Sequence, residues 1–329
     1  MASIRGVARL GMLAVGLGIG AAVASSPGIA SADPFSFDPN DIAISFDGYV
    51  LVSDGSAHAY TTTGDYGLAI ADGSGAYASA EGGTGDYALA DGTYTHAEAG
   101  GLASDTGADD DTAIDIGNNV DPSTYLAPDD GAYAGDGDLA GGTGTGSGDT
   151  AIDIGDNTND ASLGGGGADG SFAGAGGTHD GNNDTAIDIG DNSGLSDGSS
   201  AVGGNGNFAS ESGSTTGEYE GAEAIYGNDN TAVADTSYTT NGVADLAGFG
   251  SDNYASVLGP ENSFASAENG DSNVAFVVDP FGSTDSYAET YGSNSDLAAV
   301  LFTEGHAFVF NAPDVYDIVT AFGPESGMF

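Results

Sequence analysis

The sequence has almost no basic residues. Of its 329 residues only Arg5 and Arg9 are basic, against 50 acidic residues, and the formal net charge is −48. Proteins that bind nucleic acid contact phosphates through Lys and Arg, and anionic lipid surfaces attract the same side chains. The composition therefore excludes nucleic acid as a partner and argues against an anionic membrane surface.

Cysteine and tryptophan are absent, and large aliphatic side chains are few. Without cysteine the chain forms no disulfides. Its hydrophobic share is 39%, much of it alanine, so a thick core of Leu, Ile and Phe cannot be built. Two alternatives follow: a fold with a thin core of small side chains, or a largely disordered Gly-rich chain, which the 58 glycines and the high charge would suit.

Residues 1–32 have the three parts of a secretory signal peptide. Arg5 and Arg9 precede an apolar run over residues 10–23, and Ala30-Ser31-Ala32 forms a cleavage site. The run is shorter than the ~20 residues that span a bilayer. We therefore expect a chain secreted to the exterior or the cell envelope, with no transmembrane segment, no Lys and no Arg after cleavage.

A short unit recurs from residue 55 to residue 310: an aromatic residue, His or Thr, then Ala, then alternating residues, then Gly. Each unit has the alternation of a strand and is bounded by Gly, Asp or Asn turn residues. Examples are Tyr77-Ala78-Ser79-Ala80, Tyr87-Ala88-Leu89-Ala90, His96-Ala97-Glu98-Ala99 and Phe264-Ala265-Ser266-Ala267.

The spacing of these units predicts a solenoid. Marker alanines follow one another at intervals of 33 to 38 residues, at Ala78, Ala113, Ala151, Ala186, Ala222, Ala255 and Ala288. A fixed period is typical of repeats that bury apolar residues only against their neighbours. We predict an all-β parallel β-solenoid (β-helix) of about 35 residues and three short strands per coil. Coils of half this length, with two strands each, are the alternative.

The two ends differ from the repeats, and we expect each to form a cap. Within residues 33–54, Asp47-Gly48 separates two apolar runs and predicts a β-hairpin. The Gly/Asx-rich repeats would fill residues 55–310. Within residues 311–329, the apolar segment 314–322 follows Pro313, which predicts a short closing helix.

The heptapeptide DTAIDIG occurs three times, at residues 111–117, 149–155 and 184–190. In an extended strand its two Ile residues share one face, and its Ala and central Asp share the other. We expect the Ile face to be buried and Asp115, Asp153 and Asp188 to point outward. On consecutive coils these carboxylates would stack at the ~4.8 Å strand spacing and repel one another.

A divalent cation would relieve that repulsion, and calcium favours carboxylate and amide oxygens. The third copy approximates the ligand order of an EF-hand loop. Its candidate metal ligands are Asp180, Asn182, Asp184, Asp188 and Asp191, with Asp115 and Asp153 as the corresponding carboxylates of the other copies. The alternative is that these residues are solvated and keep an exported Gly-rich chain soluble.

No catalytic motif is present, and no cofactor site is predicted. The four histidines, His58, His96, His179 and His306, are far apart in sequence, and three of them lie in or beside the aromatic position of the repeat unit. The carboxylates are too numerous for any pair to indicate acid–base chemistry without geometry. We therefore expect no enzymatic activity.

The signal peptide ending before Asp33-Pro34, and the sporadic Gly-Gly-x triplets, as at 164–167 and 203–206, resemble those of the secreted Gly-rich repeat proteins of mycobacteria and related actinobacteria. The composition is similar to that of the PE-PGRS proteins, but the helical N-terminal PE module is lacking. The Ala-x-Ala-x-Gly units are also similar to the heads of trimeric autotransporter adhesins.

The leading hypothesis is a non-catalytic repeat protein of the exterior or cell envelope, with a structural, adhesive or host-interaction role and a partner on the envelope or a host surface. The first alternative is a calcium-binding solenoid that orders outside the cell, with divalent cations as ligands. The others are an ice-binding solenoid, which needs Thr ladders in register, and a polysaccharide-acting enzyme.

Overall fold

The structure is a computed structural model of the full chain. It describes residues 41–100, 109–119, 131–135, 146–155, 170–174, 181–190, 198–212, 221–235, 244–258, 264–278, 286–292, 295–302, 305–310, 318–322 and 326–327. All of them belong to one compact unit, Pro34–Phe329. The expected signal peptide, residues 1–32, lies outside the described residues.

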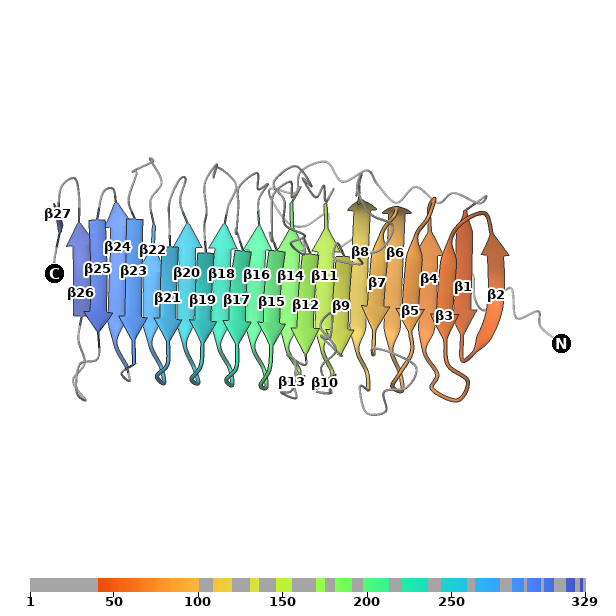
Figure 1. The fold of residues 1–329 in the computed structure, drawn as a ribbon, viewed down its shortest axis with the longest axis horizontal. Coiled ribbons are helices and arrows are strands. Elements are labelled where there is room, and N and C mark those ends of the chain that lie inside the picture. The colour runs from red at the N-terminus through yellow and green to blue at the C-terminus, as the bar shows by residue number, and fades with distance from the viewer. Residues whose placement is uncertain are drawn as a thin grey trace, which may run out of the picture. The chain divides into compact units, whose positions relative to one another are not determined.

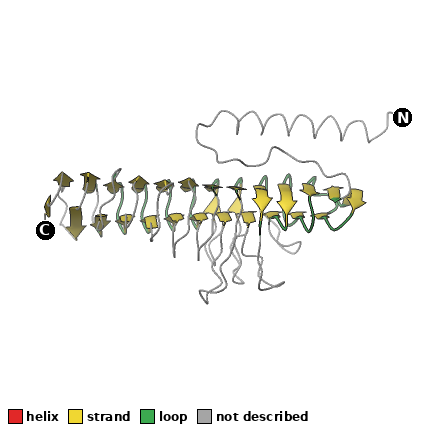
Figure 2. Ribbon diagram, turned by 90° about the horizontal axis from the view of Figure 1, so that it is seen from above, coloured by secondary structure: helices red, strands yellow, loops and turns green. Residues whose placement is uncertain are grey.

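The described residues form two long β-sheets, and successive strands alternate between them (Figures 1 and 2). Sheet A has 13 strands, in the order β2 (Tyr49–Asp54), β1 (Ile42–Phe46), β4 (Leu68–Asp72), β6 (Tyr87–Thr93), β8 (Thr112–Asn118), β11 (Thr150–Ile154), β14 (Thr185–Ile189), β16 (Phe208–Ser212), β18 (Thr231–Asp235), β20 (Tyr254–Leu258), β22 (Val274–Val277), β24 (Leu297–Phe302) and β26 (Ile318–Phe322).

Sheet B has 12 strands, which run from β3 at the N-terminal end to β27 at the other. They are β3 (His58–Thr61), β5 (Tyr77–Ala80), β7 (His96–Ala99), β9 (Gly131–Gly135), β12 (Gly170–Gly174), β15 (Gly198–Val202), β17 (Gly221–Ile225), β19 (Ala244–Gly248), β21 (Phe264–Glu268), β23 (Ser286–Tyr291), β25 (Gly305–Phe310) and β27 (Ser326–Gly327). A separate short pair joins β10 (Gly146–Ser147) to β13 (Gly181–Asn182).

The predicted all-β parallel solenoid is confirmed, but its coil differs from the one expected. From β4 onward, neighbouring strands within each sheet are parallel, so a coil holds one strand of sheet A and one of sheet B. Leu68 pairs with Tyr87, 19 residues later, whereas Thr112 pairs with Thr150, 38 residues later. The three-strand coil of about 35 residues is therefore corrected to two strands in a coil of variable length.

The core between the sheets consists almost entirely of alanine. Inward positions of successive strands stack these small side chains into columns with no exposed surface, among them Ala69, Ala78, Ala88, Ala97, Ala113, Ala151, Ala186, Ala209, Ala232, Ala255, Ala275 and Ala298. Because an Ala side chain loses no rotamer freedom on burial, each one is ordered at low entropic cost. The thin core predicted from composition is therefore present.

The two ends of the solenoid differ. At the N-terminal end, β1 and β2 form an antiparallel pair joined at Asp47-Gly48, both with positive φ, as a tight hairpin turn requires. At the other end, β26 extends sheet A in parallel beside β24. The closing helix expected over residues 314–322 is therefore wrong. Among the described residues there is no helix, and hence none long and apolar enough to cross a membrane.

Candidate functional site

The three heptapeptides lie side by side on consecutive coils, in β8, β11 and β14. Their residues pair like with like, so that Asp115, Asp153 and Asp188 form one column. All three aspartates are fully buried, together with the alanines of the same strands. The alternation was predicted correctly, but the faces were reversed. Ala and Asp point into the core, and Thr and Ile form the outer face.

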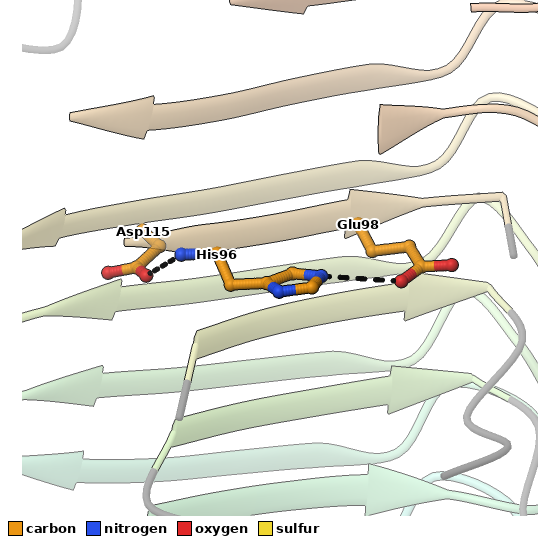
Figure 3. Close-up of polar contacts among 3 residues, drawn as sticks. All are labelled: His96, Glu98 and Asp115. Carbon is orange, nitrogen blue, oxygen red and sulfur yellow. Dashed lines mark hydrogen bonds and ion pairs between the residues drawn. The ribbon is translucent and has the colours of Figure 1, made fainter. Parts of the chain in front are cut away.

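Asp115 accepts a hydrogen bond from a backbone N–H of sheet B, which in the preceding coil goes to a backbone carbonyl. One coil earlier, the N–H of Tyr77 donates to the carbonyl of Thr95, 2.9 Å away. The N–H of His96 instead donates to Asp115 Oδ2, 2.6 Å away (Figure 3). The Asn119 side chain donates to the same oxygen at 2.9 Å. The carboxylate of Asp115 therefore accepts a backbone hydrogen bond at the start of β7.

This acid column extends over four coils. Glu211 of β16 pairs with Asp188 and is also fully buried. In the flanking coils the same position holds Ala90 on one side and Ala234 on the other. Among the coils paired here, this position of sheet A therefore carries a carboxyl group only within this block.

A second buried column runs along the turn that precedes each strand of sheet A. In every step, Oδ1 of one Asp or Asn accepts the backbone N–H of its counterpart in the next coil, at 2.7–3.2 Å. We call this column the Asx ladder. Its members are Asp86, Asp111, Asp149, Asp184, Asn207, Asn230, Asn253, Asn273 and Asp296.

Local backbone geometry positions the Asx ladder. The residue before each member has positive φ, with values between 55° at Asp229 and 88° at Gly85. This left-handed conformation is typical of Gly, Asn and Asp in tight turns. It reverses the chain immediately before the strand and directs the next side chain into the interior.

The N-terminal half of the Asx ladder differs chemically from the C-terminal half. Oδ2 of Asp86, Asp111, Asp149 and Asp184 is buried and accepts no hydrogen bond from the described residues. Burial raises the pKa of Asp86 to about 6 and that of Asp149 to about 8. Neighbouring carboxylates add to this rise, and the hydrogen bond from a backbone N–H opposes it. Burial likewise raises the pKa of both Asp111 and Asp184 to about 7.

The asparagines show what a neutral side chain does at this position. Asn230 Nδ2 donates to the Gly250 carbonyl at 3.0 Å, and Asn253 Nδ2 donates to that of Gly248 at 3.3 Å. A protonated Asp has the shape of Asn and one donor at the corresponding atom. The four aspartates are therefore suited to hold protons at mildly acidic pH, and they release them only at a cost in stability.

The described residues of the EF-hand-like set lie in three different rows of side chains. Asp184 belongs to the Asx ladder and Asp188 to the acid column, while Asn182 lies in an exposed row where it donates to Asn205 Oδ1 at 3.1 Å. Asp180 and Asp191 lie outside the described residues. Within the described ranges, no group of three or more His, Cys, Asp or Glu side chains is placed to hold a metal ion.

Two of the histidines belong to an aromatic row on the outer face of sheet B. Neighbouring rings have centroids 4.5–6.3 Å apart along His58, Tyr60, Tyr77, His96, Tyr133 and Phe172. His96 Nε2 also lies 3.4 Å from Glu98 Oε2 (Figure 3). His306 falls in β25, and His179 lies outside the described residues. His58 and His96 therefore pack in the row as aromatic rings.

The Asx ladder was missed by sequence reasoning, although its signal is present. Each member precedes Ala by two residues, as in Asp86-Tyr87-Ala88 and Asn230-Thr231-Ala232. The heptapeptide contains both buried columns, because its first Asp belongs to the Asx ladder and its second to the acid column.

Comparison with protein-family models, with curated proteins and with solved structures finds no match to this chain. Inferences about function therefore start from its residues and their geometry.

Proposed function

We propose that this protein is a non-catalytic solenoid of the cell exterior or envelope with a structural or adhesive role. The observation that carries the proposal is the inverted heptapeptide. Its carboxyl groups, the most reactive side chains in the repeat, are buried in the core, where they hold coils together. The residues left on the outer face are uncharged Thr and Ile.

The outer face carries a repetitive row of half-buried Thr and Ile side chains, among which Ile114 and Ile154 are nearly covered. Thr112, Thr150 and Thr185 stack in register beside the Ile columns. Identical side chains recur at the ~4.8 Å strand spacing, an arrangement that suits a neutral repeating ligand such as an envelope or host-surface polysaccharide. With 50 acidic residues and two basic ones, the chain would be repelled by a polyanionic partner.

Binding to isolated cell envelopes and to host-cell surfaces tests the proposal. The labelled chain of residues 33–329 should bind one of them saturably, and Ile152→Lys on the outer face should weaken binding at least about tenfold, since it charges the contact surface. Tyr226→Lys, at a turn, is the matched control. Hydrolysis of a polysaccharide or ester that a single Asp→Asn change abolishes would refute the non-catalytic role.

Ice binding is a second candidate, which the stacked Thr column favours. The column is three coils long and is flanked by Ile. Thermal hysteresis of the purified chain tests this function, with Thr150→Tyr as the disrupting variant and Tyr226→Lys as the control. A freezing point equal to the melting point would refute it.

A further inference from the structure

Strand β2 is the most exposed strand among those whose side chains are described. All six of its residues are exposed, and Tyr49 and Val50 reach 63% and 65%. In an ordinary sheet strand, alternate side chains would be buried. Leu51 and Val52 are also exposed, at 41% and 38%, so β2 presents apolar side chains on both of its faces.

The strand count of the two sheets explains this exposure. Sheet A has 13 strands and sheet B has 12. Strand β1 packs against β3, the terminal strand of sheet B, and β2 lies one strand further out, at the N-terminal end of sheet A in Figure 1. Among the described strands β2 pairs with β1 alone, and no described strand pairs with its other edge.

The open edge has little of the protection that edge strands usually carry. Charges, prolines and short strands normally prevent such edges from pairing with other chains. From Tyr49 to Ser53, β2 has no charge and no proline. A register shift in its pairing with β1, opposite Leu51, is the single protective device.

We propose that a second copy of this chain docks on β2, the two β2 strands pairing edge to edge and antiparallel about a two-fold axis at Leu51. Such a contact is isologous and closes as a dimer. It places Val50 beside Val52 of the other copy and Tyr49 beside Ser53, so that sheet A continues from one chain into the next. This proposal does not depend on the partner proposed above.

The centre of the proposed contact is uncharged despite the acidity of the chain. The acids of residues 42–54 are Asp47, at the hairpin turn, and Asp54, at the strand end, so the apolar residues around the axis carry no charge, and like charges of the two copies meet only at the two ends of the contact. The remaining coils of each copy recede from the contact at ~4.8 Å per strand. At physiological salt the screening length is about 8 Å, so all but the first coils of the two copies are screened from one another.

Sedimentation equilibrium of the chain spanning residues 33–329 tests the proposal. The wild-type chain should be a dimer at micromolar concentration, and Val50→Lys should raise the dimer dissociation constant at least about tenfold, since it places charge on the edge. Tyr66→Lys, which adds the same charge at an exposed turn (70% exposed), should leave the constant unchanged.

A cross-linking experiment covers the case in which Val50→Lys misfolds. Because the chain has no cysteine, Leu51→Cys should oxidise to a covalent dimer, since paired strands bring residues at a two-fold axis within disulfide range. Tyr66→Cys should form no covalent dimer under the same oxidant. A monomeric wild-type chain, open-ended filaments or equal cross-linking of the two cysteine variants would each overturn the proposal.

Discussion

The two halves of the Asx ladder share one backbone geometry but differ in chemistry. From Asp86 to Asp184 its members are carboxylic acids, and from Asn207 to Asn273 they are amides. Both halves pass the same hydrogen bond from Oδ1 to the next coil. Because the amide is neutral at every pH, the ionisable groups of the Asx ladder are the four acids of the Asp half and Asp296 at its C-terminal end.

Because of this difference, the stability of the N-terminal part of the solenoid depends on pH, through protonation of its four ladder aspartates. The folded state raises the pKa of these aspartates above the ordinary value of 3.8. The folded chain therefore holds protons that the unfolded chain releases. Their stabilising effect is full below about pH 4 and is lost as the pH rises through the folded pKa values of about 6 to 8.

The largest expected effect is on the pH dependence of the whole chain. Between pH 4 and pH 8 the free energy of unfolding should fall by at least about 5 kcal/mol, since each of the four carboxyls costs up to about 1.4 kcal/mol per pH unit between pH 4 and its folded pKa. Urea melts across this range measure it. Stability that rises with pH would contradict the protonated state of the Asp half.

Replacing an acid by its amide should abolish part of that loss. Asp149→Asn keeps the Oδ1 acceptor and removes the charge, so at pH 8 it should stabilise the chain by about 2–4 kcal/mol, and at pH 4 by less than about 1 kcal/mol. Urea melts of the variant and the wild type at the two pH values measure this. Equal gains at both would show that Asp149 is ionised throughout.

The reverse exchange should make the Asn half respond to pH. Asn230→Asp places a carboxyl where Nδ2 now donates to Gly250. It should destabilise the chain by about 2–3 kcal/mol at pH 8 and by less than about 1 kcal/mol at pH 4. Hydrogen exchange followed by mass spectrometry should show faster amide exchange in β16 to β20 at pH 8, and unchanged exchange in β4 to β8, which serve as the internal control.

Removing an acid from the other column should have a smaller effect that depends less on pH. Asp115→Ala leaves the His96 N–H and the Asn119 amide without their acceptor, and should cost about 1–3 kcal/mol. Asp115→Asn retains one acceptor oxygen and serves as the control. Thermal melts compare the two variants, and equal melting temperatures would show that the hydrogen bond to His96 contributes nothing.

Chelation should have the smallest effect. If protons rather than metal ions neutralise the Asp half, EDTA at pH 6 should shift the melting temperature by less than about 1 °C. Added calcium should likewise leave it unchanged. A large fall on chelation would restore the calcium-binding solenoid as the explanation of the buried carboxylates.

The repeat period and the alternation of the heptapeptide were predictable, but the choice of buried face was not. Hydrophobicity favours burying Ile114 over Ala113, and an isolated strand would do so. The deciding signal lies across coils, because Ala recurs at one parity in every strand of sheet A except β2, while the other parity varies among residues such as Ile, Leu, Ser and Phe. A core that stacks Ala on Ala has no room for a single layer of Ile.

The number of strands per coil was left open because the chain inserts connections of different lengths. The marker alanines of the middle coils are 35 and 38 residues apart, enough for three strands. Only pairing shows that the additional residues lie between two strands of one coil. The three spaced repeats of DTAIDIG thus reflected long connections and not a longer coil.

The Asx ladder also bears on how a chain of this kind can change in length. Each coil of the ladder presents one side-chain acceptor, Oδ1, to the following coil and one backbone N–H donor to the preceding coil. A coil duplicated or deleted as a unit therefore leaves the rungs on either side with their bonds intact. The number of coils can therefore change by whole repeats during evolution while the packing of the core stays the same.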